Sequence, residues 1–187
     1  GFIQPAKEVG GDFYDVIEKD NKTYIIIGDV SGKGVAASLI MAATVTSIRS
    51  SIQYLDTPTE IMGAVNQQLC KNNPNSMFVT AFLGVIDDST GQIEYVNAGH
   101  PSPIIKANGV SPLESTKGIA FGINEYAFYT SKREKLKKDS QLFLYTDGVT
   151  EAHNRLNAQF GLSALSSYIE HTLSLIHISE PTRRRTI

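Results

Sequence analysis

The sequence predicts an α+β fold in which helices pack on antiparallel sheets. Strand-length apolar runs and helical patterns follow one another in the order strands, helix pair, strands, helix. Short turn-forming segments, rather than helices, separate the neighbouring strand-like runs, which favours hairpins over alternating βαβ units. The chain has 187 residues, of which 41% are hydrophobic, so it is long enough to bury the core of one domain.

The first elements expected are a hairpin and a pair of helices. Asp20 and Asn21 suit the turn between the first two strands, and the second strand is a nearly continuous β-branched run. Apolar residues at helical spacing predict the first helix, and Pro58 lies near the first turn of the second. The expected elements are strands at Phe13–Glu18 and Thr23–Val30, a helix at Val35–Gln53, and a helix from Thr57 that ends at Asn72–Asn75.

The rest of the chain is expected to be mostly strand. The turn Asp87–Gly91 joins two apolar runs and predicts a second hairpin. A helical pattern closes this part of the chain. The expected elements are strands at Met77–Ile86, Gln92–Asn97, Pro103–Lys106, Phe128–Leu136 and Gln141–Thr146, and a helix from Phe160 to about His171.

Composition excludes several classes of protein. Seventeen basic and nineteen acidic residues give a net charge of −2, which argues against a nucleic-acid binder. No apolar run approaches the length of a membrane span, so no membrane contact is expected. The single cysteine, Cys70, cannot form an internal disulfide and indicates a reducing, cytoplasmic location.

Both ends of the chain look foreign to a natural domain. The segment Leu173–Arg183, LSLIHISEPTR, resembles the translation of a sequencing-library adapter. We therefore expect the domain to occupy residues 1–172 and residues 173–187 to be an artefactual tail. The abrupt start at Gly1 suggests that the domain is clipped at both termini.

Three aspartates lie at or beside predicted strand ends, each next to a glycine. They are Asp12, Asp29 and Asp147. A carboxylate at the edge of a buried strand is costly unless it is paired, hydrogen-bonded or bound to a metal. Because hard cations prefer oxygen ligands, and no Cys or His cluster accompanies these acids, the pattern favours Mg²⁺ or Mn²⁺ over zinc. For any one of the three, an ordinary turn role is the alternative.

Five sequence blocks in order carry a resemblance to a known family. They span Pro5 to Gly161 and resemble the SpoIIE-type branch of the metal-dependent protein phosphatases, the PPM or protein phosphatase 2C superfamily. The blocks are PAKEVGGDFYD, IGDVSGKGVAASLIMA, MFVTAFLGVID, YVNAGHPSP and LYTDGVTEA.

The resemblance implies a fold and an activity. The fold is a β-sandwich of two antiparallel sheets flanked by helices in αββα layers, here incomplete at both termini. The activity is hydrolysis of phosphoserine or phosphothreonine by water activated between two Mn²⁺ or Mg²⁺ ions. The implied substrate is a phosphorylated regulatory protein, such as a small anti-sigma-factor antagonist in bacterial signal transduction. An upstream sensor or receiver domain is also implied.

Site residues carry over position by position from the resemblance. Asp29 resembles the carboxylate that bridges both ions, and Asp12 resembles a ligand of one ion together with the carbonyl of Val30. Asp147 resembles a ligand of the other ion. Glu151 falls where the superfamily has an acid outside the ligand set or at a third metal; a solvated acid is the alternative. The glycines expected to support these loops are Gly11, Gly32, Gly34 and Gly148.

Two features of the resemblance leave alternatives open. His100, in the NAGH motif, is either a general acid or a structural residue.

The family's closing Asp motif, which completes the Asp147 metal site, is absent, so we expect this chain to bind one ion poorly and to have little activity. A degenerate partner-binding domain and a phosphatase of small metabolites are the competing functions.

Overall fold

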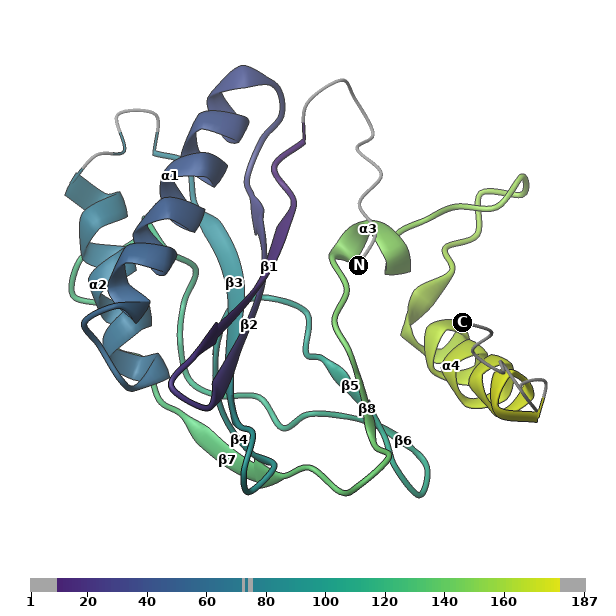
Figure 1. Ribbon diagram of the computed structural model, residues 1–187. Helices are drawn as coiled ribbons and strands as arrows, with labels where there is room; N and C mark the ends of the chain where they lie inside the picture. The colour runs from purple at the N-terminus through teal and green to yellow at the C-terminus, as the bar shows by residue number, and fades with distance from the viewer. Residues whose placement is uncertain (1–9, 72, 74–75, 179–187) are drawn as a thin grey trace, which may run out of the picture. The chain divides into compact units, whose positions relative to one another are not determined.

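The computed structural model describes residues 10–178 except 72, 74 and 75, and for 172–178 only the backbone (Figure 1). The chain divides into two compact units. The first consists of Gly1–Ser102 and Glu114–Lys138, and the second of Pro103–Leu113 and Asp139–Ile187. Each unit contains one antiparallel sheet, which confirms the α+β prediction with two antiparallel sheets.

A five-stranded sheet in the order β1-β2-β3-β4-β7 forms the first unit. The β1–β2 hairpin turns through Asp20 and Asn21 with φ of 50° and 61°, the left-handed conformation that a two-residue turn requires. The strands are β1 (Phe13–Lys19), β2 (Lys22–Val30), β3 (Val79–Asp87), β4 (Gln92–Ala98) and β7 (Lys132–Lys135).

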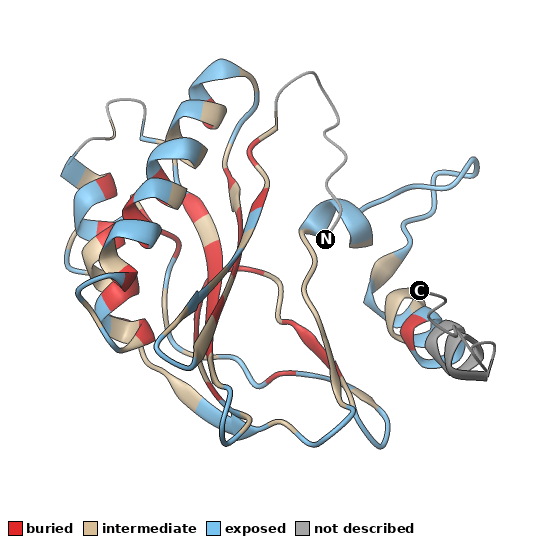
Figure 2. Cartoon of the chain, in the orientation of Figure 1, coloured by how far each residue is buried: buried red, intermediate tan, exposed pale blue. Residues whose placement is uncertain are grey.

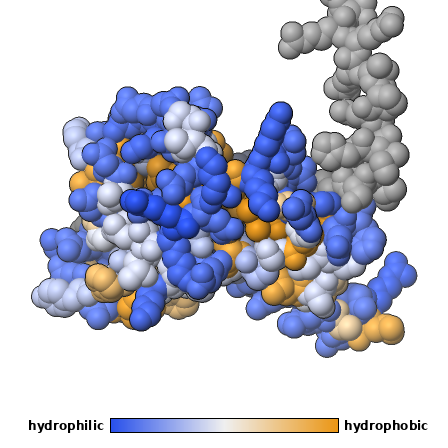
Figure 3. Space-filling model, turned by 90° about the horizontal axis from the view of Figure 1, so that it is seen from below, coloured by the Kyte–Doolittle hydropathy of each residue, from blue (hydrophilic) through white to orange (hydrophobic). Residues whose placement is uncertain are grey.

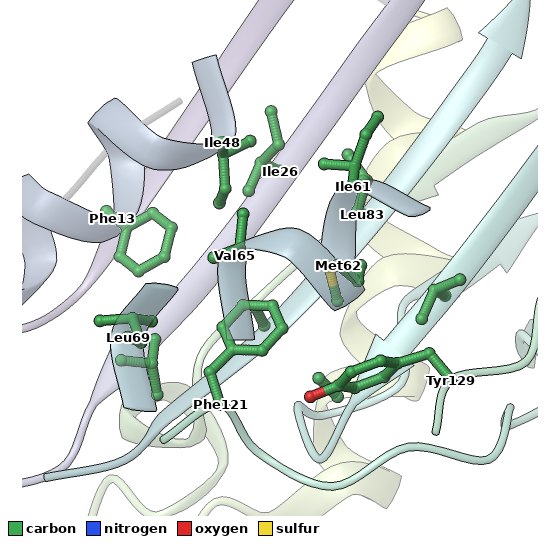
Figure 4. Close-up of a cluster of buried hydrophobic side chains, with 14 of the residues drawn as sticks. Phe13, Ile26, Ile48, Ile61, Met62, Val65, Leu69, Leu83, Phe121 and Tyr129 are labelled. Carbon is green, nitrogen blue, oxygen red and sulfur yellow. The ribbon is translucent and has the colours of Figure 1, made fainter. Parts of the chain in front are cut away.

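Helices α1 (Val35–Ile52) and α2 (Pro58–Lys71) share a hydrophobic core with one face of this sheet. Their apolar stripes meet alternate residues of the strands, because successive strand side chains point to opposite faces. Figure 4 shows Ile48 of α1 and Val65 of α2 beside Ile26 of β2. Each such buried side chain contributes about 1.5–3 kcal/mol to the stability of the fold. The packing of this helix layer therefore holds β2 in place.

Two polar contacts fasten α1 to the first hairpin. The Lys19 ammonium donates to the carbonyl oxygens of Ile52 and Gln53 at 2.8 and 3.2 Å, which caps the negative end of the helix. The Arg49 guanidinium grips the Asp15 carboxylate, with Nε to Oδ2 at 2.6 Å. Strand β1, which directly follows Asp12, therefore sets the position of α1.

By length and composition alone, α1 is apolar enough to cross a membrane, contrary to the expectation drawn from apolar runs. In the structure its Ile48 and Ile52 lie in the core, and Figure 2 marks its buried side in red. Its outer face exposes Val35 and Leu39. Figure 3 shows that hydrophobic residues reach the surface between hydrophilic ones on the face that it draws. Within the described residues it is a helix of a packed layer.

Asn66 of α2 clamps the long connection that follows Glu114. Its side chain is fully buried; Nδ2 donates to the Asn124 carbonyl at 2.8 Å, and Oδ1 accepts from Gly122 N–H at 3.1 Å. Next to this clamp, Phe121 and Val79 exchange two backbone hydrogen bonds. The connection is thereby tied to the first residue of β3.

The second unit holds a three-stranded sheet in the order β6-β5-β8. Figure 2 shows α3 and residues 151–160 in pale blue, as exposed. The Lys106 ammonium donates to the carbonyls of Ile169 and Glu170, within α4, at 3.0 and 2.9 Å. The elements are β5 (Ile104–Lys106), β6 (Val110–Pro112), β8 (Gln141–Phe143), α3 (Asp147–Thr150) and α4 (Gly161–Ile178).

Several predicted elements are wrong in extent. The strand expected over Phe128–Leu136 is only β7, because Tyr129 is buried with its hydroxyl on Ile119 O, and Thr130 bonds to Lys117. The strand expected over Gln141–Thr146 ends at Phe143. The last helix continues to Ile178, and β6 and α3 were not predicted. Of the helix-ending segment Asn72–Asn75, only Asn73 lies within the described residues.

Replacing Asn66 by alanine is expected to destabilise the protein. The change leaves the Gly122 N–H and the Asn124 carbonyl without these bonds, and each buried group so orphaned costs about 1–3 kcal/mol. Urea unfolding should show a loss of about 2–4 kcal/mol. Gln67→Ala, an exposed neighbour on α2, is the matched control and should change stability by less than about 0.5 kcal/mol. Equal effects of the two substitutions would refute the clamp.

Candidate functional site

The end of β2 carries the first group of candidate residues. β2 is paired on both sides, with β1 and with β3, and its register with β3 runs to its last residue. Asp29 lies opposite Thr80, and Val30 opposite Val79. Val30 is buried and Asp29 half-buried. A carboxylate is therefore held at a defined position at the rim of the sheet.

Asp12 and Gly11 lie beside this strand end. Phe13 pairs with Gly28, so continuing the antiparallel register by one residue sets Asp12 opposite Asp29. A Cβ on Gly11 would fall 2.8 Å from the Val30 carbonyl oxygen and 3.2 Å from Oδ1 of Asp29. Gly11 therefore leaves room beside these two oxygens that a side chain would fill.

The loop after β2 is fixed to β3 and to α1. Ser31 N–H donates to the Phe78 carbonyl, and Phe78 N–H donates to the Ser31 hydroxyl, both at 2.8 Å. Gly32 and Gly34 have φ of 92° and 83°, which favours glycine at both positions before α1 begins. The Ser38 hydroxyl of α1 donates to Gly10 O at 3.2 Å. The two glycine-containing loops thus meet at the start of α1.

His100 lies behind the same strand end. It is 5% exposed, and its Nδ1 is 3.0 Å from the hydroxyl of Thr80, the residue opposite Asp29. The Thr80 hydroxyl donates in turn to the Asp29 carbonyl at 3.4 Å. Sequence reasoning singled out His100 but missed Thr80 and Ser31, since a threonine inside a strand and a serine after one carry no distinguishing signal.

The remaining candidates belong to the second unit. Asp147 is the first residue of α3, and Glu151 follows its last, with Glu151 N–H donating to the Asp147 carbonyl at 2.8 Å. Both are exposed. Gly148 lies in this helix, where an added Cβ would meet only the Thr146 hydroxyl, at 3.9 Å. The strand predicted over Gln141–Thr146 thus ends at Phe143, and Asp147 and Glu151 lie at the two ends of a helical turn.

The arrangement suits a hard cation better than a soft one. Within the described residues no group of three or more His, Cys, Asp and Glu side chains forms a metal cluster. The first unit supplies a pair of carboxylates, from Asp12 and Asp29, and a carbonyl oxygen beside a glycine that leaves room. Oxygen donors of this kind are those that Mg²⁺ and Mn²⁺ prefer.

A family model matches most of the chain. The model described as Stage II sporulation protein E (SpoIIE) matches residues 19–185. Protein IcfG of Synechocystis sp. is 30% identical over 192 residues, covering 87% of this chain and 30% of its own length. Phosphoserine phosphatase RsbU of Bacillus subtilis is 31% identical over 150 residues, covering 79% and 44%. The chain thus spans less than half the length of these curated relatives.

Solved structures match in fold. The RsbU and RsbW domains of Rv1364c from Mycobacterium tuberculosis superpose with a TM-score of 0.77 at 26% identity, covering 91% of this chain and 47% of that one. RsbX in complex with magnesium superposes with a TM-score of 0.65 at 18% identity, covering 88% and 80%.

Replacing Gly11 by alanine is expected to disturb the end of β2. The new Cβ would overlap the Val30 carbonyl oxygen at 2.8 Å, and such overpacking costs about 1–3 kcal/mol. Urea unfolding of the variant measures this loss. Gly148→Ala is the matched control, because its Cβ enters open space on a helix and should be neutral or stabilising by up to about 1 kcal/mol. A Gly11→Ala protein as stable as the wild type would show that the space is not tightly bordered.

Proposed function

We propose that this chain, which belongs to the SpoIIE family, is a metal-dependent phosphatase that hydrolyses phosphoserine or phosphothreonine on a regulatory partner protein. The observation that carries the proposal is that Gly11, the neighbour of Asp12, lies against the end of β2, where a Cβ on it would fall 2.8 Å from the Val30 carbonyl oxygen and 3.2 Å from Oδ1 of Asp29. The name of the relative RsbU, phosphoserine phosphatase, supports the reaction class.

The residues proposed to hold metal ions come from both units. Asp12, Asp29 and the Val30 carbonyl are proposed ligands of one Mn²⁺ or Mg²⁺ ion. Asp147 is a proposed ligand of a second ion, with Glu151 as a further acid on the same short helix. A bound divalent cation lowers the pKa of its water and neutralises phosphate charge. The magnesium in RsbX supports the choice of a hard cation.

The chain's own residues keep the site in shape and attract the substrate. Ser31 locks the loop to β3, and the positive φ of Gly32 and Gly34 lets the chain turn from β2 into α1. Lys33, between these glycines, is exposed and adds a positive charge to which a phosphate is drawn. These features support the binding of a phosphorylated side chain at the rim of the sheet.

The partner that we propose is a small phosphorylated anti-sigma-factor antagonist in the cytoplasm. RsbU and RsbP are both named phosphoserine phosphatases, which supports phosphoserine as the group that is hydrolysed. Because the chain covers part of these relatives, we also propose that a sensor or receiver domain precedes it in the whole protein. The retained acids Asp12, Asp29 and Asp147 argue against a degenerate binding domain.

The test is hydrolysis of a phosphoserine protein with and without Mn²⁺ by the chain extended past Thr172 with its native continuation, because the family's closing Asp motif is absent from residues 1–187. Asp29→Asn keeps the side chain's size but removes its charge, and it should lower kcat/KM by about a hundred-fold, the upper end of losses from altered metal surroundings. Small phosphate esters assayed in parallel separate a protein phosphatase from a phosphatase of metabolites.

Asp139→Asn is the matched control. Asp139 is exposed, and its φ of 65° suits asparagine equally well, so activity should not change. Metal-independent turnover, or an Asp29→Asn variant as active as the wild type, would contradict the proposed site. A folded protein without turnover under any metal would favour a binding domain.

We also propose that the domain ends near Thr172. The proposal rests on the segment Leu173–Arg183, LSLIHISEPTR, which resembles a translated sequencing-library adapter. Sequencing the locus from an independent library should give a different continuation after codon 172. Recovery of the same LSLIHISEPTR segment would contradict this boundary.

A further inference from the structure

A buried histidine of the first unit reaches the strand that carries Asp29. His100 is 5% exposed. It comes from the turn after β4, whereas Asp29 ends β2, with β3 between them in the sheet. Thr80, at the start of β3, joins the two.

The backbone around His100 is held without its ring. Asn97 accepts from His100 N–H at 2.7 Å and donates to His100 O at 2.8 Å, and both bonds are buried. Gly99, with φ of 73°, closes the turn and bridges to Ala81 of β3. The turn therefore holds the imidazole of His100 at a fixed place through contacts of the backbone rather than of the ring.

Thr80 links the histidine to the strand end by two contacts of its hydroxyl. The hydroxyl lies 3.0 Å from His100 Nδ1 and 3.4 Å from the Asp29 carbonyl oxygen. A threonine hydroxyl can donate one proton and accept as well, so it can serve both contacts at once. The contacts therefore run from His100 through Thr80 to the backbone of Asp29.

We propose that His100 is a positioning residue for the metal site, acting through Thr80 on the backbone of Asp29. Thr80 is directly opposite Asp29 in the ladder, so fixing the hydroxyl also fixes the strand end that presents the carboxylate and the Val30 carbonyl. This inference rests on the proposed function for its metal. It decides the alternative left open for His100 in favour of a role away from the substrate.

The experiment measures Mn²⁺ affinity by calorimetry on the chain and its variants. His100→Ala and Thr80→Val should each weaken binding about ten- to a hundred-fold, as loss of groups that orient metal ligands does. The double variant should bind no more weakly than the worse single variant, because the two residues act in series. His100→Asn should restore most of the affinity, since its side-chain amide can either donate to or accept from the Thr80 hydroxyl in place of Nδ1.

A second readout needs no metal. Amide hydrogen exchange of Asp29, Val30 and Ser31 should quicken about ten-fold in His100→Ala and Thr80→Val, while amides of β4 keep their rates. Thr46→Val is the matched control, because its hydroxyl donates to a backbone carbonyl, that of Ala42, on the exposed side of α1. It should change neither readout.

The outcomes separate the two proposals. The role of His100 is overturned if folded His100→Ala binds Mn²⁺ as tightly as the wild type and its amides at the end of β2 exchange at wild-type rates. That result leaves the phosphatase proposal standing. A wild type that binds no Mn²⁺ overturns the proposed metal site, and unchanged exchange in the variants would then overturn the positioning role as well. Failure of His100→Asn to restore affinity, or additive losses in the double variant, contradicts the series order.

Discussion

The backbone ladder that runs along both sides of β2 governs the rest of this structure. Because β2 is paired with β1 as far as Gly28 and with β3 as far as Val30, the positions of Asp29 and Val30 follow from the ladder rather than from a flexible loop. A slip of one residue would turn every side chain to the opposite face. The core under α1 and α2 forbids such a slip, since Ile26 would leave it.

The helix layer and the rim of the sheet are consequently connected by direct contacts. Asp15, three residues after Asp12, is gripped by Arg49, while Ser38 of the same helix bonds to Gly10. On the other side of β2, Phe78 is locked to Ser31. The proposed metal ligands at the end of β2 therefore depend on contacts made well away from them.

The sequence predicts this structure well where the determining signals are local. The Asp20-Asn21 turn, both helices of the pair and the hairpin through Asp87–Gly91 rest on short-range patterns, and the structure confirms them. The shortened β7 and the connection before it were not predictable, because Asn66 of α2 and the Tyr129 hydroxyl hold that segment from afar. At the proposed site, the pattern of an acid next to a glycine singled out Asp12 and Asp29 in the sequence. Thr80 could be identified only from the strand register, which pairs it with Asp29.

The two units interleave along the chain, and this has a consequence for synthesis on the ribosome. The β5–β6 hairpin leaves the ribosome before β7, the last strand of the first unit, and long before its own partner β8. Ile104 and Ile105, buried in the finished protein, then wait without the strand that pairs with them. Apolar strands in this condition are where nascent chains aggregate. Slow translation between residues 107 and 141 would lengthen that exposure, so codon choice in this stretch bears on the yield of folded protein.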